Sequence, residues 1–208
     1  MFAISLKIED RPCLVVGGGK VAERKILSLL AAGAKVKVVS PKLTPQLKSL
    51  AEKGAIKHLP RGYCPADLTD VDLVICATND ENLNRSVAFD CKKERLWINV
   101  VDNPKLSTFF LPAVLQRGDL SIAVSTKGKS PLLARKIKEK LATQYGPEYA
   151  ELVNLLGEAR IQLMQSCPDQ RKRKVILEKM LDLDLFGIIK RGEQRRLKEW
   201  IARCISSQ

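Results

Sequence analysis

The sequence predicts an α/β protein in which a Rossmann-type, doubly wound parallel sheet is followed by a smaller, mostly helical unit. Three observations predict this fold class. Short apolar runs alternate with helical segments through the first hundred residues, the glycine turn Gly17-Gly18-Gly19 follows the first run, and Asp72 to Ala77 is continuously apolar after its first residue. A parallel strand that is buried on both faces requires such a continuous run.

The first strand and helix are predicted on either side of the glycine turn. Cys13 to Val16 is an apolar run of strand length, and apolar residues then recur at helical spacing from Val21 up to Gly33. Lys35 to Val39 is a second run rich in β-branched residues. The order strand, glycine turn, helix, glycine, strand is that of a βαβ unit.

A second helix and a third strand are expected after Ser40-Pro41, which stops the preceding strand. Thr44-Pro45 has the form of an N-cap with proline at the first helical position, so this helix should begin there and end near Gly54. Ile56 to Leu59 is predicted as the third strand.

The second half of the sheet repeats the alternation. After the strand at Asp72 to Ala77, Thr78-Asn79-Asp80 forms a loop and helix cap, and a helix is predicted from Glu81 to Lys93. Trp97 to Val101 is the next strand and ends at Asp102. Strands and helices at this spacing imply right-handed crossovers in a doubly wound sheet.

The alternation stops after Pro104. Phe109 to Leu111 and Leu120 to Val124 are predicted as short strands around the turn Arg117-Gly118-Asp119, and the loop Ser125 to Ser130 leads into a helix.

The rest of the chain is predicted to be helical and strongly charged. The helix that begins at Pro131 should be followed by others, with breaks at Gly146-Pro147, Cys167-Pro168 and Gly192. We place the domain boundary near Pro112. No internal repeat is visible.

The composition is that of a soluble globular protein, with 45% hydrophobic residues over 208 positions. No apolar run approaches the roughly 20 residues of a membrane span, and the charged start lacks a signal-peptide core. We therefore expect a cytoplasmic protein with no membrane partner. The six cysteines lack CxxC spacing and are predicted to be reduced packing residues.

The formal charge of +13 should attract polyanions. RNA-binding modules usually interleave exposed aromatic residues with basic ones, whereas only 5% of this chain is aromatic. We therefore expect a small substrate with several carboxylates and no nucleic-acid partner. Nucleic-acid binding stays as an alternative that rests on charge alone, with steep salt dependence as its signature.

The segment Gly17 to Ala22 fits the dinucleotide-binding pattern GxGxxA. Gly17 would make the tight turn, Gly19 would leave room for the pyrophosphate, and Ala22 would allow close packing of helix and strand. The phosphates would rest on the helix N-terminus. The alternative is a glycine-rich turn that binds no ligand.

One expected feature is missing from this site. The second strand ends in Ser40-Pro41-Lys42, where an Asp or Glu normally holds the adenosine ribose hydroxyls. The sequence alone therefore leaves NAD and NADP open. Lys42 would favour a 2′-phosphate unless it is simply a solvated loop cation.

Together these residues resemble the precorrin-2 dehydrogenase family, which includes the N-terminal module of siroheme synthase. The resemblance covers about two-thirds of the chain in order and spacing. The matching segments are VVGGGKVAERK (Val15 to Lys25), VVSP (Val38 to Pro41), ATND (Ala77 to Asp80), NVVDNP (Asn99 to Pro104), TFFLPA (Thr108 to Ala113) and AVSTKGKSPLLARKIKEKL (Ala123 to Leu141).

The resemblance implies a homodimer whose chain has three parts: an NAD-binding Rossmann domain over residues 1–112, a dimerisation region over 113–146 and a C-terminal helical domain over 147–208. It implies the NAD-dependent oxidation of precorrin-2 to sirohydrochlorin. It also implies NAD as the cofactor despite the missing acid. Some members then insert Fe²⁺ to make siroheme, and the sequence leaves this second activity open.

Asp102 corresponds to the family's functional aspartate and is predicted to be the general base, because it follows a strand at the carboxyl edge of the sheet. The alternative is that it only caps the turn before Pro104. The predicted cofactor contacts are Gly17, Gly19, Lys20, Val21, Ser40, Pro41, Lys42, Thr78, Asn79 and Asp80, with helix capping as the alternative role of Asp80.

The predicted substrate contacts are Lys127, Lys129, Ser130 and Arg135. Ser130 before Pro131 is also a complete N-cap, so a structural role and a binding role are both open. The cations there, like Arg24 and Lys25, have the alternative of being solvated surface groups. His58 is expected to be structural, and no metal site is predicted. A non-catalytic NAD-sensing domain is the competing function; it explains the glycine turn but neither the charge nor the Gly128 to Arg135 motif.

Overall fold

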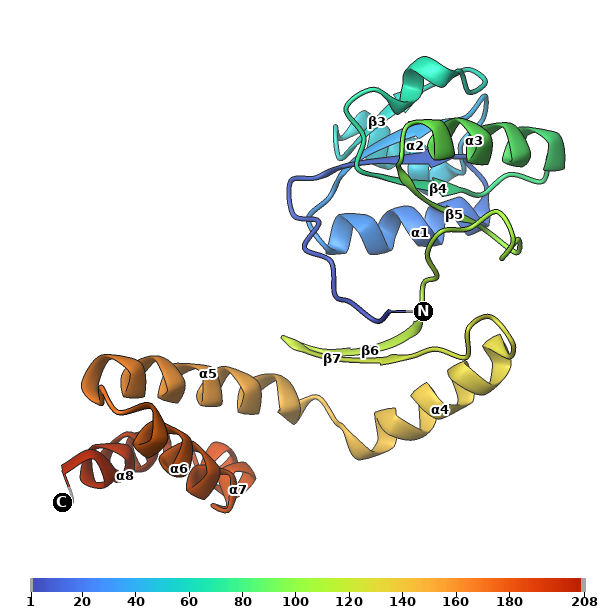
Figure 1. Cartoon of the computed structure of the whole chain (residues 1–208). Coiled ribbons are helices and arrows are strands. Elements are labelled where there is room, and N and C mark those ends of the chain that lie inside the picture. Colours follow the sequence, from blue (N-terminus) through green and yellow to red (C-terminus); the bar gives the residue numbers. More distant parts are fainter. Residues whose placement is uncertain (1, 207–208) are drawn as a thin grey trace. The chain divides into compact units, whose positions relative to one another are not determined.

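The computed structural model describes residues 2–206, which form two compact units, one up to Leu111 and one from Pro112 onward (Figure 1). Met1 and residues 207–208, at the outer ends of the predicted first and last domains, lie outside the described part. Each unit has its own core and is described by itself.

The first unit is built on a parallel sheet, as predicted. Its five strands have the order β3-β2-β1-β4-β5. They are β1 (Pro12–Val16), β2 (Lys35–Val39), β3 (Ile56–Leu59), β4 (Leu73–Cys76) and β5 (Trp97–Val100). This is the doubly wound order, in which the chain leaves the central strand first to one side and then to the other.

Three α-helices and one 3₁₀ turn connect these strands (Figure 1). They are α1 (Lys20–Ala31), α2 (Pro45–Glu52), η1 (Pro65–Leu68) and α3 (Glu81–Lys93). The predicted caps are present: the Thr44 hydroxyl accepts a hydrogen bond from the Leu47 amide, and Asp80 accepts from two amides of α3. Each cap satisfies a helix amide that would otherwise lack a partner.

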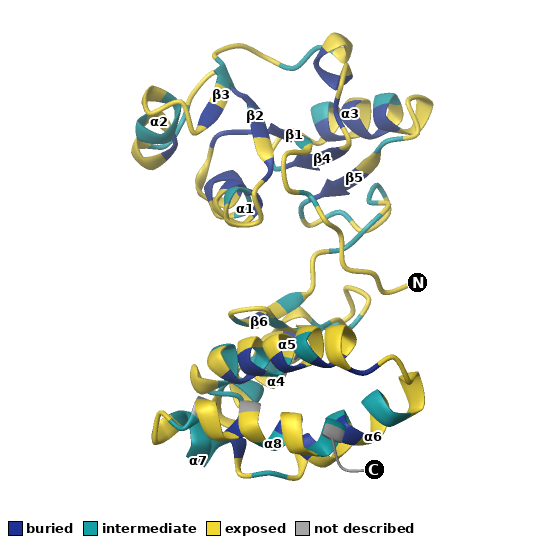
Figure 2. Cartoon of the chain, turned by 90° about the vertical axis from the view of Figure 1, so that its left-hand side faces the viewer, coloured by how far each residue is buried: buried dark blue, intermediate teal, exposed yellow. Residues whose placement is uncertain are grey.

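The strands and parts of the helices that flank them are buried, so the core lies on both faces of the sheet (Figure 2). Successive strand residues point to opposite faces. Cys13 and Val15 of β1 pack with the buried residues of α1 and α2. Leu14 and Val16 pack instead with those of α3. A β1 buried on both faces is the reason that its sequence is continuously apolar.

Hydroxyl side chains cover the open edge of β5. The Ile98 amide donates to Thr108 Oγ1 at 2.8 Å, and the Val100 amide donates to Ser107 Oγ at 3.0 Å. The Thr108 amide in turn donates to the Ile98 carbonyl at 2.8 Å. The segment after β5 therefore satisfies part of the edge that another strand would otherwise pair with.

The prediction of a strand at Phe109 to Leu111 is wrong. This segment is irregular, and the Phe109 carbonyl accepts from Asn99 Nδ2 at 2.9 Å. The hairpin is formed by β6 (Ala113–Arg117) and β7 (Leu120–Val124). Arg117 pairs with Leu120 across the two-residue turn, so the strand before the turn starts directly after Pro112.

The second unit continues with five helices that the structure describes. They are α4 (Pro131–Gln144), α5 (Glu148–Ser166), α6 (Gln170–Leu181), α7 (Leu185–Lys190) and α8 (Gln194–Ser206). The three predicted breaks are present, and a fourth, at residues 182–184, was not predicted. Buried residues of α5, α6, α7 and α8 form one core (Figure 2). Leu163 and Met180 are completely buried in it.

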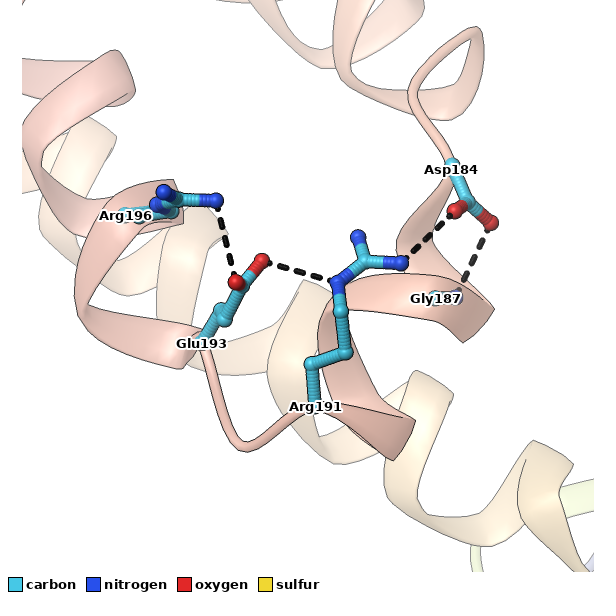
Figure 3. Close-up of polar contacts among 5 residues, drawn as sticks. All are labelled: Asp184, Gly187, Arg191, Glu193 and Arg196. Atoms are coloured by element: carbon cyan, nitrogen blue, oxygen red, sulfur yellow. Dashed lines mark hydrogen bonds and ion pairs between the residues drawn. The ribbon is translucent and has the colours of Figure 1, made fainter.

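A polar network holds the short helix α7 at both ends (Figure 3). Asp184 accepts from the Gly187 amide at 2.9 Å and lies 3.5 Å from Arg191. Glu193 contacts both Arg191 and Arg196 at 3.0 Å. These exposed pairs fix the turn between α7 and α8, while the apolar core supplies most of the stabilisation.

Between residues 2 and 206, no helix combines the length and the apolar character that a membrane crossing requires. All six cysteines are free thiols. Burial raises the pKa of Cys13 to about 11 and that of Cys76 and Cys91 to about 12. These three thiols are therefore protonated at neutral pH and act as packing residues, as predicted.

Leu163→Ala is expected to lower the free energy of unfolding of the helical core by about 2–5 kcal/mol, because it removes a fully buried side chain and leaves a cavity. Urea unfolding followed by Trp200 fluorescence in a Trp97→Phe background measures this core alone, since the chain has two tryptophans. Met164→Ala is the matched control, because Met164 is 60% exposed and should change the free energy by less than about 0.5 kcal/mol. Equal effects at the two positions would contradict the described orientation of α5.

Candidate functional site

The carboxyl ends of four parallel strands lie in one row. Paired residues of neighbouring strands make up this row, in the order Val39, Val16, Cys76 and Val100. The amide of the next residue in β1, β4 and β5 donates back to the row, with N–O distances of 2.9, 2.8 and 2.9 Å at Gly17, Ala77 and Val101. Every segment that leaves the sheet here therefore starts from a fixed position, at the edge where doubly wound sheets bind their ligands.

Two glycines are required where these segments approach one another. Gly17 has a φ of +119°, and a Cβ there would lie 2.4 Å from the Ala77 carbonyl oxygen. A Cβ on Gly18 would lie 2.1 Å from the Lys42 carbonyl oxygen. At Gly19, by contrast, no atom lies within 4 Å of the Cβ position. The space in front of Gly19 is therefore open, as the dinucleotide-binding pattern predicts.

A cleft of about 400 Å³ lies over this edge of the sheet. Most of the predicted cofactor contacts line it, whereas Lys42 and Asp80 do not. The predicted residues in the lining are Gly17, Gly19, Lys20, Val21, Ser40, Pro41, Thr78 and Asn79. The lining also contains residues that were not among the predicted cofactor contacts, including Gly18, Arg61, Gly62, Tyr63 and Leu83.

The N-terminus of α1 faces this cleft without a side-chain cap. Its N-cap residue is Gly19, which has no side chain, whereas α2, α3 and α4 each have a capping side chain. The first-turn amides of a helix have no partner within the helix, and the helix dipole adds positive potential there. This end of α1 therefore suits a phosphate group.

The missed residues Arg61, Gly62 and Tyr63 follow β3 and are held by side-chain bonds. Arg61 makes two hydrogen bonds to Asp67, at 2.8 and 2.6 Å, and the Tyr63 hydroxyl donates to Asp90 at 3.0 Å. The bond to Arg61 lowers the pKa of Asp67 despite burial, and burial raises the pKa of Tyr63. The rule that ligands bind beyond the carboxyl ends of strands, applied to β3 as well, would have identified this segment.

The loop after β4 is held by the buried side-chain amide of Asn84, a residue of α3. Asn84 Oδ1 accepts from Thr78 Oγ1 at 2.6 Å and from Cys76 Sγ at 3.0 Å, and Asn84 Nδ2 donates to the Thr78 carbonyl at 3.2 Å. Asp80 caps α3 through the amides of Asn82 and Leu83. Asp80 therefore has the structural role that was its alternative, and Thr78 is presented to the cleft in one orientation.

The loop after β2 is held by one of its own side chains, Ser40, and by His58 of β3. Ser40 Oγ donates to the Lys42 carbonyl at 2.7 Å, and His58 Nε2 lies 2.9 Å from the Ser40 carbonyl oxygen. His58 thus supports the loop after β2. Within the described part of the chain, no group of three or more His, Cys, Asp or Glu side chains is placed to hold a metal ion.

Asp102 lies in the turn after β5, with a left-handed φ of 59° and an exposed side chain. The turn itself is held by other groups, because the Asn103 amide donates to the Val100 carbonyl and Ser107 Oγ donates to the Asn103 carbonyl. The Asp102 carboxylate makes no hydrogen bond or ion pair with a described residue. Burial and Arg24 lower the pKa of Lys25, whereas the charge of Asp102 opposes that shift, so Lys25 is an electrostatic neighbour of Asp102.

The predicted substrate contacts belong to the second unit. Lys127 and Gly128 adopt left-handed φ values of 55° and 77°, and Lys127 and Lys129 are exposed. Ser130 caps α4, because its hydroxyl accepts from the Leu133 amide at 3.3 Å. Arg135 Nε donates to Glu139 at 2.8 Å, so this guanidinium is already paired.

Comparison with known proteins matches two family descriptions to this chain. Residues 4–113 match the family described as "Putative NAD(P)-binding", which covers the first unit with its sheet and cleft. Residues 117–144 match the family described as "Sirohaem biosynthesis protein central", which covers the hairpin turn, β7 and α4.

Similar whole proteins agree with these matches. A siroheme synthase of Thioalkalivibrio sulfidiphilus is 37% identical over 99% of this chain, and one of Methylobacillus flagellatus is 42% identical over 92%. The chain spans 42% and 40% of their lengths. A solved structure named "SirC, precorrin-2 dehydrogenase" shares the fold with a TM-score of 0.81 and 29% identity, over 98% of this chain and all of that one. The chain therefore belongs to the NAD(P)-binding family, in the combination with a sirohaem-biosynthesis central segment that is found in the N-terminal module of siroheme synthases.

Proposed function

We propose that this protein oxidises precorrin-2 to sirohydrochlorin with NAD⁺ as the acceptor, on the route to siroheme. The observation that carries the proposal is the uncapped N-terminus of α1 at the open Gly19, in a chain whose whole fold matches a precorrin-2 dehydrogenase. The balanced reaction converts precorrin-2 and NAD⁺ into sirohydrochlorin, NADH and a proton. Purified protein mixed with precorrin-2 and NAD⁺ should therefore produce NADH absorbance in step with sirohydrochlorin.

The residues around the cleft fit a dinucleotide. The amides at the start of α1 would hold the pyrophosphate, with Gly19 leaving the space that a Cβ would fill. Ser40 and Pro41 would border the adenosine ribose, and Thr78 would lie on the nicotinamide side. When bound, NAD⁺ supplies the site that accepts a hydride. Its choice over NADP is part of the proposal.

Asp102 is proposed as the general base. It follows β5, two strands from β1, so roughly 10 Å of sheet separates the end of β5 from the glycine turn. Its carboxylate is exposed and makes no bond among the described residues that would have to break before it accepts a proton. The turn-capping alternative has no hydrogen bond to support it in the described part. A carboxylate there would also stabilise positive charge on an oxidised macrocycle.

The basic loop before α4 is proposed to bind the substrate's carboxylates. Lys127 and Lys129 are exposed on a loop bounded by the cap at Ser130, and the chain carries a charge of +13. Arg135 would have to exchange its bond with Glu139 for one with the substrate. A field from several cations attracts a polyanion more strongly than any single pair does.

Two further parts of the proposal concern iron and assembly. The similar proteins named siroheme synthase favour Fe²⁺ insertion into sirohydrochlorin as a second activity, in which Asp102 would accept pyrrole protons. The same assay with added Fe²⁺ tests it through the spectrum of siroheme.

A homodimer is proposed because α4 exposes apolar side chains that a second copy would cover, namely Leu132, Leu133 and Ile137.

Gly19→Val should leave the fold intact and abolish NADH binding, because a Cβ there has no protein atom within 4 Å and the side chain would fill the space for the pyrophosphate. Gly18→Val should instead destabilise the protein, since its Cβ meets the Lys42 backbone. Fluorescence titration with NADH and a thermal melt distinguish the two variants. Parental NADH affinity in Gly19→Val would place the nucleotide elsewhere.

Asp102→Asn should reduce kcat by roughly 10²- to 10⁴-fold, the usual contribution of a positioned general base. NADH affinity and melting temperature should change little, because the carboxylate supports no bond of the turn. Asn103→Asp is a control for a charge change in the same turn. A folded Asp102→Asn protein with parental turnover would exclude Asp102 from the chemistry.

Changing Lys129 and Arg135 together to Ala should raise KM for precorrin-2 and weaken its dependence on salt, because two cations near the substrate are lost. The pair Lys53→Ala and Lys57→Ala removes the same charge from exposed positions in the first unit. Steady-state kinetics over a range of salt concentrations compares the two. If both pairs change KM equally, the substrate responds to net charge and the loop is not its site.

A further inference from the structure

Glu23 is a buried carboxylate close to the nucleotide cleft for which the proposed chemistry has no role. It lies in the first turn of α1, and its side chain is only 10% exposed, against 79% for Lys20. One carboxylate oxygen accepts a hydrogen bond from Thr44 Oγ1, and the other lies 3.2 Å from Lys20 Nζ. The Thr44 bond lowers the pKa of Glu23 against the effect of burial, and Lys20 lowers it further, so the group is ionised at neutral pH.

Both partners of Glu23, Lys20 and Thr44, lie close to the cleft or to the loop after β2 that lines part of it. Lys20 lines the cleft together with Ser40 and Pro41. Thr44 ends the same loop, and its amide donates to the Gly18 carbonyl at 3.0 Å. The negative charge of Glu23 is therefore held between the start of α1 and the loop after β2.

This loop is where a Rossmann domain distinguishes its two cofactors. An acid at the end of the second strand normally binds the ribose hydroxyls of NAD, and a nearby cation accommodates the 2′-phosphate of NADP. This chain has Ser40 in place of the acid and two lysines, Lys20 and Lys42, that a 2′-phosphate could use. Lys42 does not line the cleft, and Lys20 is paired with Glu23.

We propose that Glu23 determines the preference for NAD over NADP, by neutralising Lys20 and by placing a fixed negative charge beside the loop after β2. Glu23 pairs with Lys20 and does not itself line the cleft. A 2′-phosphate would meet a compensated cation and a buried anion, whereas the uncharged 2′-hydroxyl of NAD meets neither penalty. The inference rests on the proposed NAD(P)-dependent function and adds the residue that selects the cofactor.

The decisive measurement is the ratio of the Kd for NADPH to the Kd for NADH, obtained by fluorescence titration of the full chain at low salt. Glu23→Gln keeps an oxygen that can accept from Thr44 and removes the charge. It should lower this ratio by roughly three- to tenfold, because Lys20 becomes available to the phosphate. Lys20→Met in the parent should raise the ratio, because the carboxylate then lacks its partner.

The double variant tests whether the charge of Glu23 itself acts at the loop after β2. In a Lys20→Met background the carboxylate has no cationic partner, so Glu23→Gln should bring the raised ratio of Lys20→Met back toward the parental value. Glu178→Gln is the matched control: it releases Lys174, 3.7 Å away in the second unit, and should leave the ratio unchanged. Thermal melts of all variants report any general loss of stability.

Several outcomes would overturn the inference. Glu23→Gln that weakens both nucleotides equally and lowers the melting temperature would show that Glu23 only ties α1 to the loop. If Glu23→Gln does not fold, an unchanged ratio in Lys20→Met leads to the same conclusion. A parent that prefers NADPH also contradicts it. A parent that binds neither nucleotide contradicts the proposed function itself, which separates that failure from a failure of the role of Glu23.

Discussion

The close approach of the glycine turn to the segments that follow β2 and β4 is the constraint on which the first unit depends. Gly17 lies against the Ala77 carbonyl and Gly18 against the Lys42 carbonyl, both closer than a Cβ would allow. Strand pairing places the ends of β2, β1 and β4 in one row, and the segments that follow them can approach this closely because Gly17 and Gly18 have no side chain. The row in turn places the start of α1 at Gly19, and the cleft lies in front of it. The backbone contacts of the glycine turn thus determine where the cleft lies.

Most polar side chains around the cleft are already paired within the protein. Arg61 is bonded to Asp67, Thr78 to Asn84 and Lys20 to Glu23, and each pair fixes a segment that lines or borders the cleft. Such pairs preorganise the cleft, because a ligand does not have to order these groups when it binds. Two other groups lack such a partner in the described part. The first-turn amides of α1 have no capping side chain, and the Asp102 carboxylate, which does not line the cleft, makes no bond. These are the groups to which we assign phosphate binding and proton transfer.

Local signals were sufficient for most of the fold and for much of the site. The sheet and its helices were predicted from the apolar runs, the cap at Thr44 and the glycines at both ends of α1. Each of these signals affects only the conformation of residues close to it in sequence. The misplaced strand at Phe109 to Leu111 failed because hairpin register depends on the turn, which pairs Arg117 with Leu120. The segment Arg61 to Tyr63 was missed because no motif marks it and part of its support is distant in sequence. Arg61 is bonded to Asp67, six positions away, but Tyr63 is bonded to Asp90, 27 positions away. Glu23 and Thr44 are likewise 21 positions apart, so no local pattern announces their bond.

The conformation of Asp102 alone does not distinguish a catalytic residue from a turn residue. Asp10 has the same left-handed φ, 58° against 59°, and aspartate is among the residues that tolerate it. The two differ in what their carboxylates do. Asp10 forms an ion pair with Lys35 at 3.0 Å, so its charge has a partner within the protein. Asp102 forms no such pair among the described residues, and glycine would satisfy its backbone with less strain. The turn therefore does not need this carboxylate, and what Asp102 contributes beyond glycine is a negative charge at the edge of the sheet where the nucleotide cleft lies.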